Sequence, residues 1–119
     1  MVLGIGNDMI EIERIKKACE KQAFLLRCYT SKEIELCKGR ESMLAGNFAV
    51  KESVAKSFGT GFRGFETIDI EVLRDDLGKP YVNLYGGARK IYDEMGATNI
   101  HVTITNTKDY AVAMAVLEK

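Results

Sequence analysis

Apolar and polar residues alternate at both ends of the chain, which is the pattern of half-buried strands. Val2 to Ile10 is such a run and carries two glycines. Ile100 to Thr105 and Tyr110 to Leu117 are two more, joined by the polar stretch Asn106 to Asp109. We therefore predict one strand at the start of the chain and a hairpin at its end.

Helical periodicity dominates the region that follows the first strand. Glu11 to Gln22 places its apolar residues on one face, and Thr30 with Glu33 has the spacing of a capping box that begins a second, short helix. Glu41 to Phe58 has the strongest helical pattern in the chain and is followed by Gly59. We expect this last segment to be the central helix.

The remaining segments predict a second hairpin and a short helix. Ile68, Ile70 and Val72 alternate with acidic residues, and a polar turn then leads into Tyr81 to Leu84. A helical pattern follows from about Ala88 to Met95. Helices mixed with antiparallel pairs, without a βαβ rhythm, indicate an α+β fold in which an antiparallel sheet packs against the central helix.

The composition limits the size and the partners of this fold. The chain has 119 residues, of which 46% are hydrophobic, so we expect a single compact domain over residues 1–119. So small a domain has little wall for a deep pocket, which favours a site shared between subunits. Its 17 basic and 17 acidic residues give no overall attraction to nucleic acid or to an anionic membrane.

The N-terminus and the cysteines indicate the compartment. The chain begins without a basic leader, and Asp8 interrupts its first apolar run too early for a signal peptide. No apolar run approaches the length of a membrane span. Cys19, Cys28 and Cys37 are odd in number and include no close pair, so we interpret them as reduced thiols. We expect a cytoplasmic protein.

Two charged residues fall within the apolar face of the central helix. When the sequence is projected as a helix, at about 100° per residue, Lys51 and Glu52 fall within that face, although a polar face is available. In the structural interpretation, Lys51 extends its ammonium group to solvent and Glu52 pairs with Lys56 one turn later. In the functional one, Glu52 is a partly desolvated carboxylate kept charged by a lysine or a metal ion.

Asp8 is a second candidate carboxylate. It ends the first strand after Gly4 and Gly6, where small residues allow another backbone or a phosphate to approach closely. Taken alone, an aspartate here is an exposed turn residue or a helix cap. Magnesium, however, takes one or two protein carboxylates and fills its other positions with water and phosphate oxygens, so Asp8 and Glu52 together are sufficient.

Two further segments offer groups that bind phosphate. The Gly59-Thr60-Gly61 turn exposes backbone N–H groups, although a helix C-terminus has the wrong dipole sign and a plain turn is the alternative. Thr103 and Thr105 share one strand face with the only histidine, His101. That face is either a hydroxyl-bearing binding surface or an ordinary solvated face of a sheet.

The first predicted helix is basic on its polar side. Arg14, Lys17 and Lys21 lie on or near it, together with Lys16, and acidic residues dilute the positive charge. The charges either solvate an amphipathic helix or steer an acidic partner helix onto it.

The order and spacing of these motifs together resemble those of the holo-acyl-carrier-protein synthase family over nearly the whole chain. In chain order they are Gly4-Ile5-Gly6-Asn7-Asp8, Tyr29-Thr30 with Glu33, Phe48-Ala49-Val50-Lys51-Glu52, Lys56 with Gly59-Thr60-Gly61, Gly78-Lys79-Pro80, and His101-Val102-Thr103-Ile104-Thr105. The resemblance implies a small trimeric transferase with its active sites at the subunit interfaces.

The resemblance also implies an activity. Such an enzyme transfers the phosphopantetheine group of coenzyme A to a serine of an acyl carrier protein for fatty acid biosynthesis. It implies a Mg²⁺ ion held by Asp8 and Glu52, catalysis by these two residues with Lys56, and carrier docking on Arg14, Lys17 and Lys21. It assigns coenzyme binding to Lys51, Lys56, Gly59, Thr60, Gly61, Thr103, Thr105 and Asn106. The proton acceptor is left open between Glu52 and a water on the metal.

Three asparagines depart from the family pattern. Asn106 replaces a usual histidine, Asn47 a common arginine, and Asn7 a threonine or an apolar residue. The first two changes remove positive charge that we expect on the coenzyme side. They leave open a catalytically weakened paralogue that acts as a carrier-binding module. A second alternative is an unrelated metal-dependent nucleotide hydrolase, which would also use two carboxylates and a glycine turn.

Overall fold

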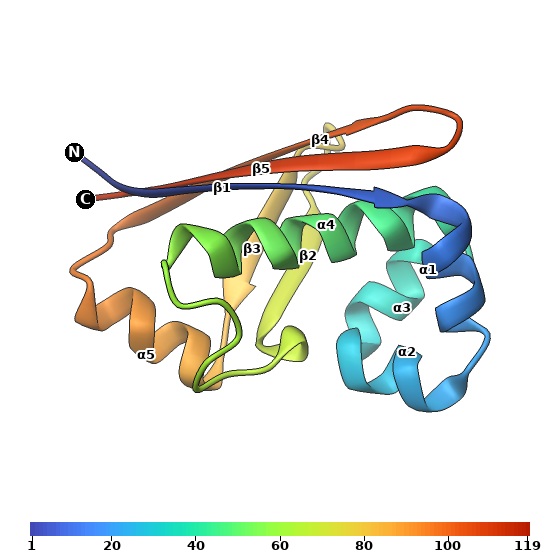
Figure 1. Cartoon of the computed structure of the whole chain (residues 1–119), viewed down its shortest axis with the longest axis horizontal. Helices are drawn as coiled ribbons and strands as arrows, with labels where there is room; N and C mark the ends of the chain where they lie inside the picture. Colours follow the sequence, from blue (N-terminus) through green and yellow to red (C-terminus); the bar gives the residue numbers. More distant parts are fainter.

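The computed structural model describes all of residues 1–119 and contains two antiparallel sheets and five α-helices (Figure 1). The elements are β1 (Val2–Glu11), α1 (Ile12–Cys19), α2 (Gln22–Cys28), α3 (Ser31–Cys37), α4 (Glu41–Ser57), the 3-10 turn η1 (Thr67–Asp69), β2 (Ile70–Arg74), β3 (Pro80–Leu84), α5 (Gly86–Glu94), β4 (Asn99–Asn106) and β5 (Tyr110–Glu118). The predicted α+β class, the central helix and both hairpins are confirmed. None of the helices is both long enough and apolar enough to span a bilayer.

The larger sheet has the order β1-β5-β4, so the first strand pairs with the last. The register places Asp8 opposite Ala113 and Thr103 opposite Met114. The chain ends lie side by side, because the Met1 ammonium donates a hydrogen bond to the Lys119 carbonyl at 2.9 Å (Figure 1). β2 and β3 form the second, two-stranded sheet.

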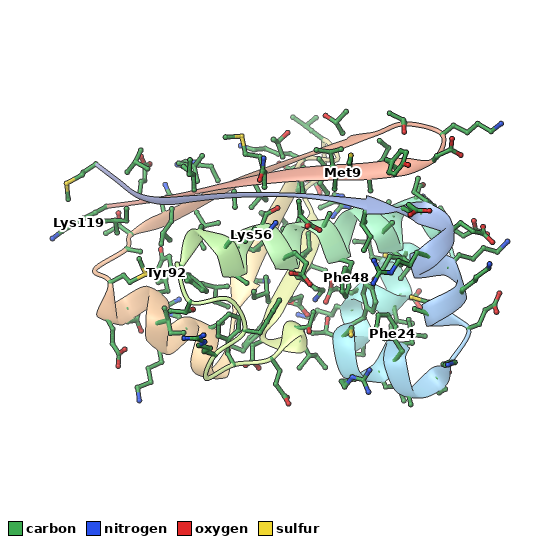
Figure 2. All side chains as sticks on the ribbon, in the orientation of Figure 1. Met9, Phe24, Phe48, Lys56, Tyr92 and Lys119 are labelled. Atoms are coloured by element: carbon green, nitrogen blue, oxygen red, sulfur yellow. The ribbon has the colours of Figure 1, made fainter.

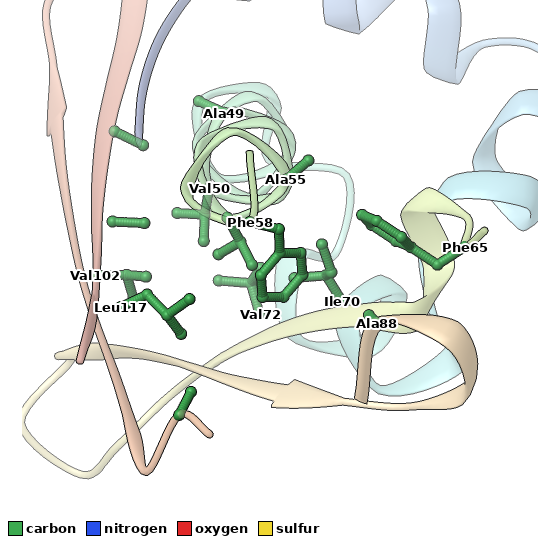
Figure 3. Close-up of a cluster of buried hydrophobic side chains, with 14 residues drawn as sticks. Ala49, Val50, Ala55, Phe58, Phe65, Ile70, Val72, Ala88, Val102 and Leu117 are labelled. Carbon is green, nitrogen blue, oxygen red and sulfur yellow. The ribbon is translucent and has the colours of Figure 1, made fainter. Parts of the chain in front are cut away.

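Helix α4 runs beneath β1 and β5, with α1, α2 and α3 gathered at one end and α5 toward the other (Figure 1). It is buried at 11 of its 17 residues, because other elements pack around it. One core joins α4 to the large sheet, β2 and α5 and includes Val50, Val54 and Leu117 (Figure 3). A second core joins the N-terminal half of α4 to α1, α2 and α3.

Strand β1 lies unusually close to α4 because two of its residues have no side chain. A Cβ atom added to Gly6 would lie 1.9 Å from the Ser53 carbonyl oxygen, and one added to Gly4 would lie 1.9 Å from that of Ser57. The prediction that these glycines admit a close neighbour is therefore confirmed, and the neighbour is the α4 backbone.

The structure corrects the predicted helix from Glu11 to Gln22. This segment is divided, because α1 ends at Cys19 and Lys21 adopts an extended conformation before α2 begins. The reversal brings Phe24 of α2 back against Phe48 of α4, with 6.0 Å between the ring centroids. A continuous helix would carry Phe24 away from the core. The three cysteines are free, as predicted.

Candidate functional site

Asp8, Glu52 and Lys56 meet where β1 crosses α4. Asp8 lies on the face of β1 that carries Gly4 and Gly6, while Glu52 and Lys56 occupy successive turns of α4. The Lys56 ammonium donates to the Asn7 carbonyl at 2.8 Å and lies 3.4 Å from Asp8 Oδ1. The expected ion pair between Glu52 and Lys56 is not formed, because Lys56 reaches across to β1 instead.

These three side chains line a cleft of about 510 Å³. Arg14 and Ile15 of α1 form one side of it, and the rings of Phe24 and Phe48, tilted by 34° to each other, close it toward α2 (Figure 2). Phe24 was missed as a lining residue because α2 was not predicted. The only indication in the sequence is that Phe24 is an apolar residue beyond the end of α1.

Glu52 is the least satisfied charged group in the cleft. It is half-buried, and its carboxylate makes no hydrogen bond or ion pair within the chain. Burial raises the pKa of Glu52, and the negative charge of Asp8 raises this pKa further, whereas Lys56 lowers it. A desolvated carboxylate beside a second carboxylate is stabilised by a bound cation.

The donor set suits a hard divalent cation such as magnesium. No group of three or more histidine, cysteine, aspartate or glutamate side chains forms a metal cage in the chain. Asp8 and Glu52 supply oxygen ligands only, and Mg²⁺ usually keeps several waters and substrate phosphate oxygens beside one or two carboxylates. The two residues therefore fit the protein's share of such a coordination shell.

Lys51 lies in the core, which corrects both expectations for it. Its side chain is 0% exposed and its ammonium pairs with the equally buried Glu33 at 2.8 Å. It also donates to the carbonyls of Thr67 and Ile70. These acceptors use all three donors of the ammonium, so Lys51 neither reaches solvent nor has a donor free for a coenzyme.

Asn47 belongs to the same buried cluster. Its amide donates to Glu33 Oε2 at 3.1 Å and to the Val72 carbonyl at 3.0 Å, while its Oδ1 atom has no partner. The expectation that Asn47 stands on the coenzyme side is therefore wrong. Asn47, which departs from the family pattern, instead lies where α3, α4 and β2 pack together.

The other predicted coenzyme-binding residues lie apart from the Asp8 cleft. Gly59 and Gly61 have φ values of 77° and 62°, in an exposed turn after α4. Thr103 and Thr105 lie on the face of the large sheet opposite to Asp8, since their strand positions alternate with that of Ile104, which is paired in register with Ala113. Within one chain the structure does not bring these threonines to the cleft.

The basic residues expected to dock a partner are exposed. Arg14 and Lys17 lie on α1, and Arg14 also reaches the rim of the cleft. Lys21 lies in the linker between α1 and α2 rather than on one helix with Arg14. The positive surface therefore follows a bend in the chain beside the cleft.

Comparison with known proteins assigns a family to this arrangement. A family model described as the 4′-phosphopantetheinyl transferase superfamily matches residues 4–115. Among curated proteins, a holo-acyl-carrier-protein synthase of Lachnoclostridium phytofermentans is 53% identical over 118 residues, which cover 99% of this chain and 97% of that protein. One from Fusobacterium nucleatum is 44% identical, covering 98% of this chain and 99% of the relative.

Solved structures give the same result. The holo-acyl-carrier-protein synthase of Neisseria meningitidis is 32% identical and superimposes with a TM-score of 0.91, with full coverage of both chains. The enzyme of Helicobacter pylori, solved in complex with coenzyme A, is 30% identical with a TM-score of 0.85, covering 96% of this chain and 99% of that one. The likeness extends over the whole fold, including the strand and helix that form the cleft.

Proposed function

Because the chain belongs to the 4′-phosphopantetheinyl transferase superfamily, as a holo-acyl-carrier-protein synthase, we propose that its reaction takes place in the cleft of Asp8, Glu52 and Lys56. The enzyme transfers the phosphopantetheine group of coenzyme A to a serine of an acyl carrier protein. The observation that carries the assignment is Glu52, a half-buried carboxylate that has no partner and lies beside Asp8.

Asp8 and Glu52 are the residues that would hold a magnesium ion. When bound there, Mg²⁺ supplies Lewis-acid stabilisation of the charge that develops on the transferred phosphoryl group. The raised pKa of Glu52 supports this role, because a cation at this position relieves the repulsion between the two carboxylates.

The chain's own residues orient and stabilise the transfer. The serine oxygen of the carrier attacks the phosphorus nearest pantetheine, the bond from that phosphorus to the bridging oxygen breaks, and adenosine 3′,5′-bisphosphate leaves. Lys56, held by the Asn7 carbonyl at 2.8 Å, points its positive charge into the cleft, where the phosphoryl oxygens gain negative charge. The serine proton passes to water or to Glu52, which lies in the same cleft.

The two substrates approach from different sides. The carrier protein docks on the exposed basic residues Arg14, Lys17 and Lys21, beside the cleft. Coenzyme A extends from Lys56 toward the turn of Gly59, Thr60 and Gly61. Thr103 and Thr105 contact it from a neighbouring subunit, because within one chain they face away from Asp8. Asn106 lies on the same sheet face as Asp8 but does not line the cleft, so it too contacts the coenzyme from a neighbouring subunit.

The outer face of the large sheet supports the homotrimer that this arrangement needs. Large apolar side chains on it are exposed in the single chain: Ile5 (64%), Met9 (65%), Tyr110 (41%) and Met114 (45%). Met9 lies on this outer side of β1 in Figure 2. A contiguous apolar face of this kind indicates a protein interface. We place the enzyme in the cytoplasm, which its three free thiols favour.

Mass measurement of an apo-carrier protein after incubation with coenzyme A and Mg²⁺ tests the function. The wild type should add one phosphopantetheine group per carrier. Asp8→Ala and Glu52→Ala should each slow the transfer at least about 100-fold, as when one electrostatic contact to transition-state charge is removed. Asp76→Ala, in the exposed turn before β3, is the matched control and should be unchanged.

The possible failures of this experiment separate the two parts of the proposal. Absence of transfer by the wild type would contradict the function. Near-normal turnover of Asp8→Ala or Glu52→Ala at saturating Mg²⁺ would contradict the cation site and leave the function intact.

A further inference from the structure

The segment that joins α4 to η1 is fixed by hydrogen bonds only at its two ends. At its start the Gly59 N–H donates to the Lys56 carbonyl at 3.0 Å, and at its end the Glu66 N–H donates to Asp69 Oδ2 at 3.1 Å. Between them, residues 60–65 make no backbone–backbone hydrogen bond. Their N–H groups are therefore unpaired within the chain, and packing alone holds this stretch in place.

Aromatic rings provide one part of that packing. The Phe65 ring lies edge-on to the Phe58 ring, with 5.6 Å between the centroids, and 5.2 Å from the Phe62 ring. Phe58 and Phe65 belong to the same core as Ala88 of α5 (Figure 3). The rings anchor the side chains of the segment, while its backbone is supported from α5.

Gly87, in the first turn of α5, makes the closest approach to that backbone. A Cβ atom added there would lie 1.9 Å from the Gly64 carbonyl oxygen and 2.9 Å from Phe65 Cβ, both well below van der Waals contact. The φ angle of Gly87 is not positive, so its own conformation does not require glycine. Alanine is also the better helix former. The contact with Gly64 is therefore the feature that requires glycine at this position.

We propose that Gly87 is a positioning residue for coenzyme A. By letting Gly64 lie against α5, it fixes where the N–H groups of Thr60 and Gly61 stand relative to Lys56. The inference rests on the proposed function, in which the coenzyme extends from Lys56 toward this turn. Gly87 does not line the cleft, so it acts through the segment and not by contact with the substrate.

A side chain at position 87 must push the segment away from α5. Both ends of the segment stay tied by their hydrogen bonds, so the displacement falls on the unpaired stretch between them. A displacement of about 1 Å is enough to spoil a well-aligned contact with a substrate. Docking of the carrier protein should be unaffected, because α1 and α5 lie toward opposite ends of α4 (Figure 1).

Steady-state kinetics of phosphopantetheine transfer by the full-length protein test this inference. Gly87→Ala should raise the KM for coenzyme A about tenfold, the effect of losing one hydrogen bond to a charged group. The KM for the carrier protein and kcat should not change, as when uniform binding of one substrate is lost. A merely structural role would instead lower kcat, because fewer molecules are folded, and would leave both KM values unchanged.

Two further variants of α5 and its C-terminal turn complete the test. Gly96→Ala is the matched control, because Gly96 has a φ of 74° and an added Cβ atom would meet only the Lys119 side chain, at 3.8 Å. It strains the backbone without pushing on another element, so both KM values should match the wild type. Ala88→Gly loosens the first turn of α5 without adding an atom, since Ala88 is fully buried. It should raise the KM for coenzyme A by a smaller factor, and it decides the question if Gly87→Ala does not fold.

The outcomes that would overturn the inference are distinct. An unchanged KM for coenzyme A in folded Gly87→Ala, or in Ala88→Gly where that variant decides, would mean that α5 does not position the turn. An equal rise in both KM values, or the same rise in Gly96→Ala, would mean that the effect is not specific to this contact. These results leave the proposed function intact, whereas absence of transfer by the wild type would overturn the proposed function and this inference with it.

Discussion

Two adjacent residues of helix α4, Lys51 and Glu52, belong to two charged clusters on different sides of the helix. Lys51 points into the core, where it pairs with Glu33, and neither charged side chain is exposed. Asn47 donates a hydrogen bond to Glu33, and two backbone carbonyls accept hydrogen bonds from Lys51. Glu52 points into the cleft, where it has no partner and Asp8 repels it. One helix thus presents a fully bonded ion pair on one side and an incompletely bonded carboxylate on the other.

The difference between the two clusters teaches how to separate a structural charge from a functional one. Burial alone does not distinguish them, because Lys51 is the more buried of the two residues. What differs is whether the hydrogen-bonding capacity is used within the chain. A charge that the fold leaves without a partner destabilises the free protein, and such groups gather at binding sites.

The largest effect is expected from breaking the buried cluster. Lys51→Met leaves Glu33 as an uncompensated charge in the core, which should lower the free energy of unfolding by about 3–5 kcal/mol. Denaturant unfolding followed by circular dichroism measures this. Lys56→Met, which removes a lysine that is 52% exposed on the same helix, is the control and should change the free energy by less than about 1 kcal/mol.

Removing both charges of the buried pair sharpens this test. Lys51→Met combined with Glu33→Leu should recover most of the lost stability, since apolar residues often replace a buried ion pair without cost. A single Lys51→Met variant as stable as the wild type would contradict the structural role of this cluster.

The next effect concerns the close contact that forms the cleft. In Gly6→Ala the new methyl group would meet the Ser53 carbonyl, so β1 must move away from α4 and carry Asp8 from Glu52. We expect a loss of about 1–3 kcal/mol in stability, as in overpacked cores, together with weaker Mg²⁺-dependent transfer. Val2→Ala, at an exposed position of the same strand, is the control. An unchanged transfer rate would mean that Asp8 need not lie against α4.

A smaller effect is expected at the rim of the cleft. Reversing Arg14 and Lys21 to glutamate should raise the Michaelis constant for the carrier protein but not for coenzyme A, since each exposed contact contributes about 0.2–1 kcal/mol. Reversing Lys79 and Lys90, which are exposed on other elements, makes the same change in net charge and is the control. An equal loss for both substrates, or no dependence on salt, would move carrier docking away from α1.

The smallest effect is a gain in stability from removing the unpaired carboxylate. The folded-state pKa of Glu52 is raised, so its contribution to stability is fully present below the ordinary glutamate pKa and is lost as pH rises through the folded value. Glu52→Gln should therefore match the wild type in acid and exceed it at neutral pH, by less than about 1 kcal/mol. Unfolding curves across this pH range, without Mg²⁺, measure the difference. A variant less stable than the wild type at neutral pH would contradict it.

Sequence patterns predicted the elements whose signals are local. The bounds of α4, the capping box at Thr30 and the two hairpins follow from periodicity and turn residues a few positions apart. The buried pair of Lys51 could not be found in this way, because Glu33 is 18 residues distant and lies on another helix. The alternation of buried and exposed residues expected in strand β2 does not hold, for the same reason. Glu71 is buried there, because Thr30, Asn83 and Tyr85 donate hydrogen bonds to it from other elements.

The candidate site was predicted in part. Asp8 and Glu52 were expected together, and the structure places them at one cleft. No pattern in a single chain indicates that Thr103 and Asp8 occupy opposite faces of the sheet, because this depends on the register between β4, β5 and β1. Residues that a neighbouring subunit supplies cannot be placed from local patterns at all.

The central claim is that Glu52, unlike its neighbour Lys51, exists to bind a cation with the substrate. Calorimetric titration of coenzyme A into the wild type and Glu52→Gln, each with and without Mg²⁺, tests it most directly. We expect Mg²⁺ to tighten binding to the wild type at least about tenfold and to leave Glu52→Gln unchanged, with the variant binding no more weakly than the wild type when Mg²⁺ is absent. The same Mg²⁺ dependence in both proteins would contradict the claim.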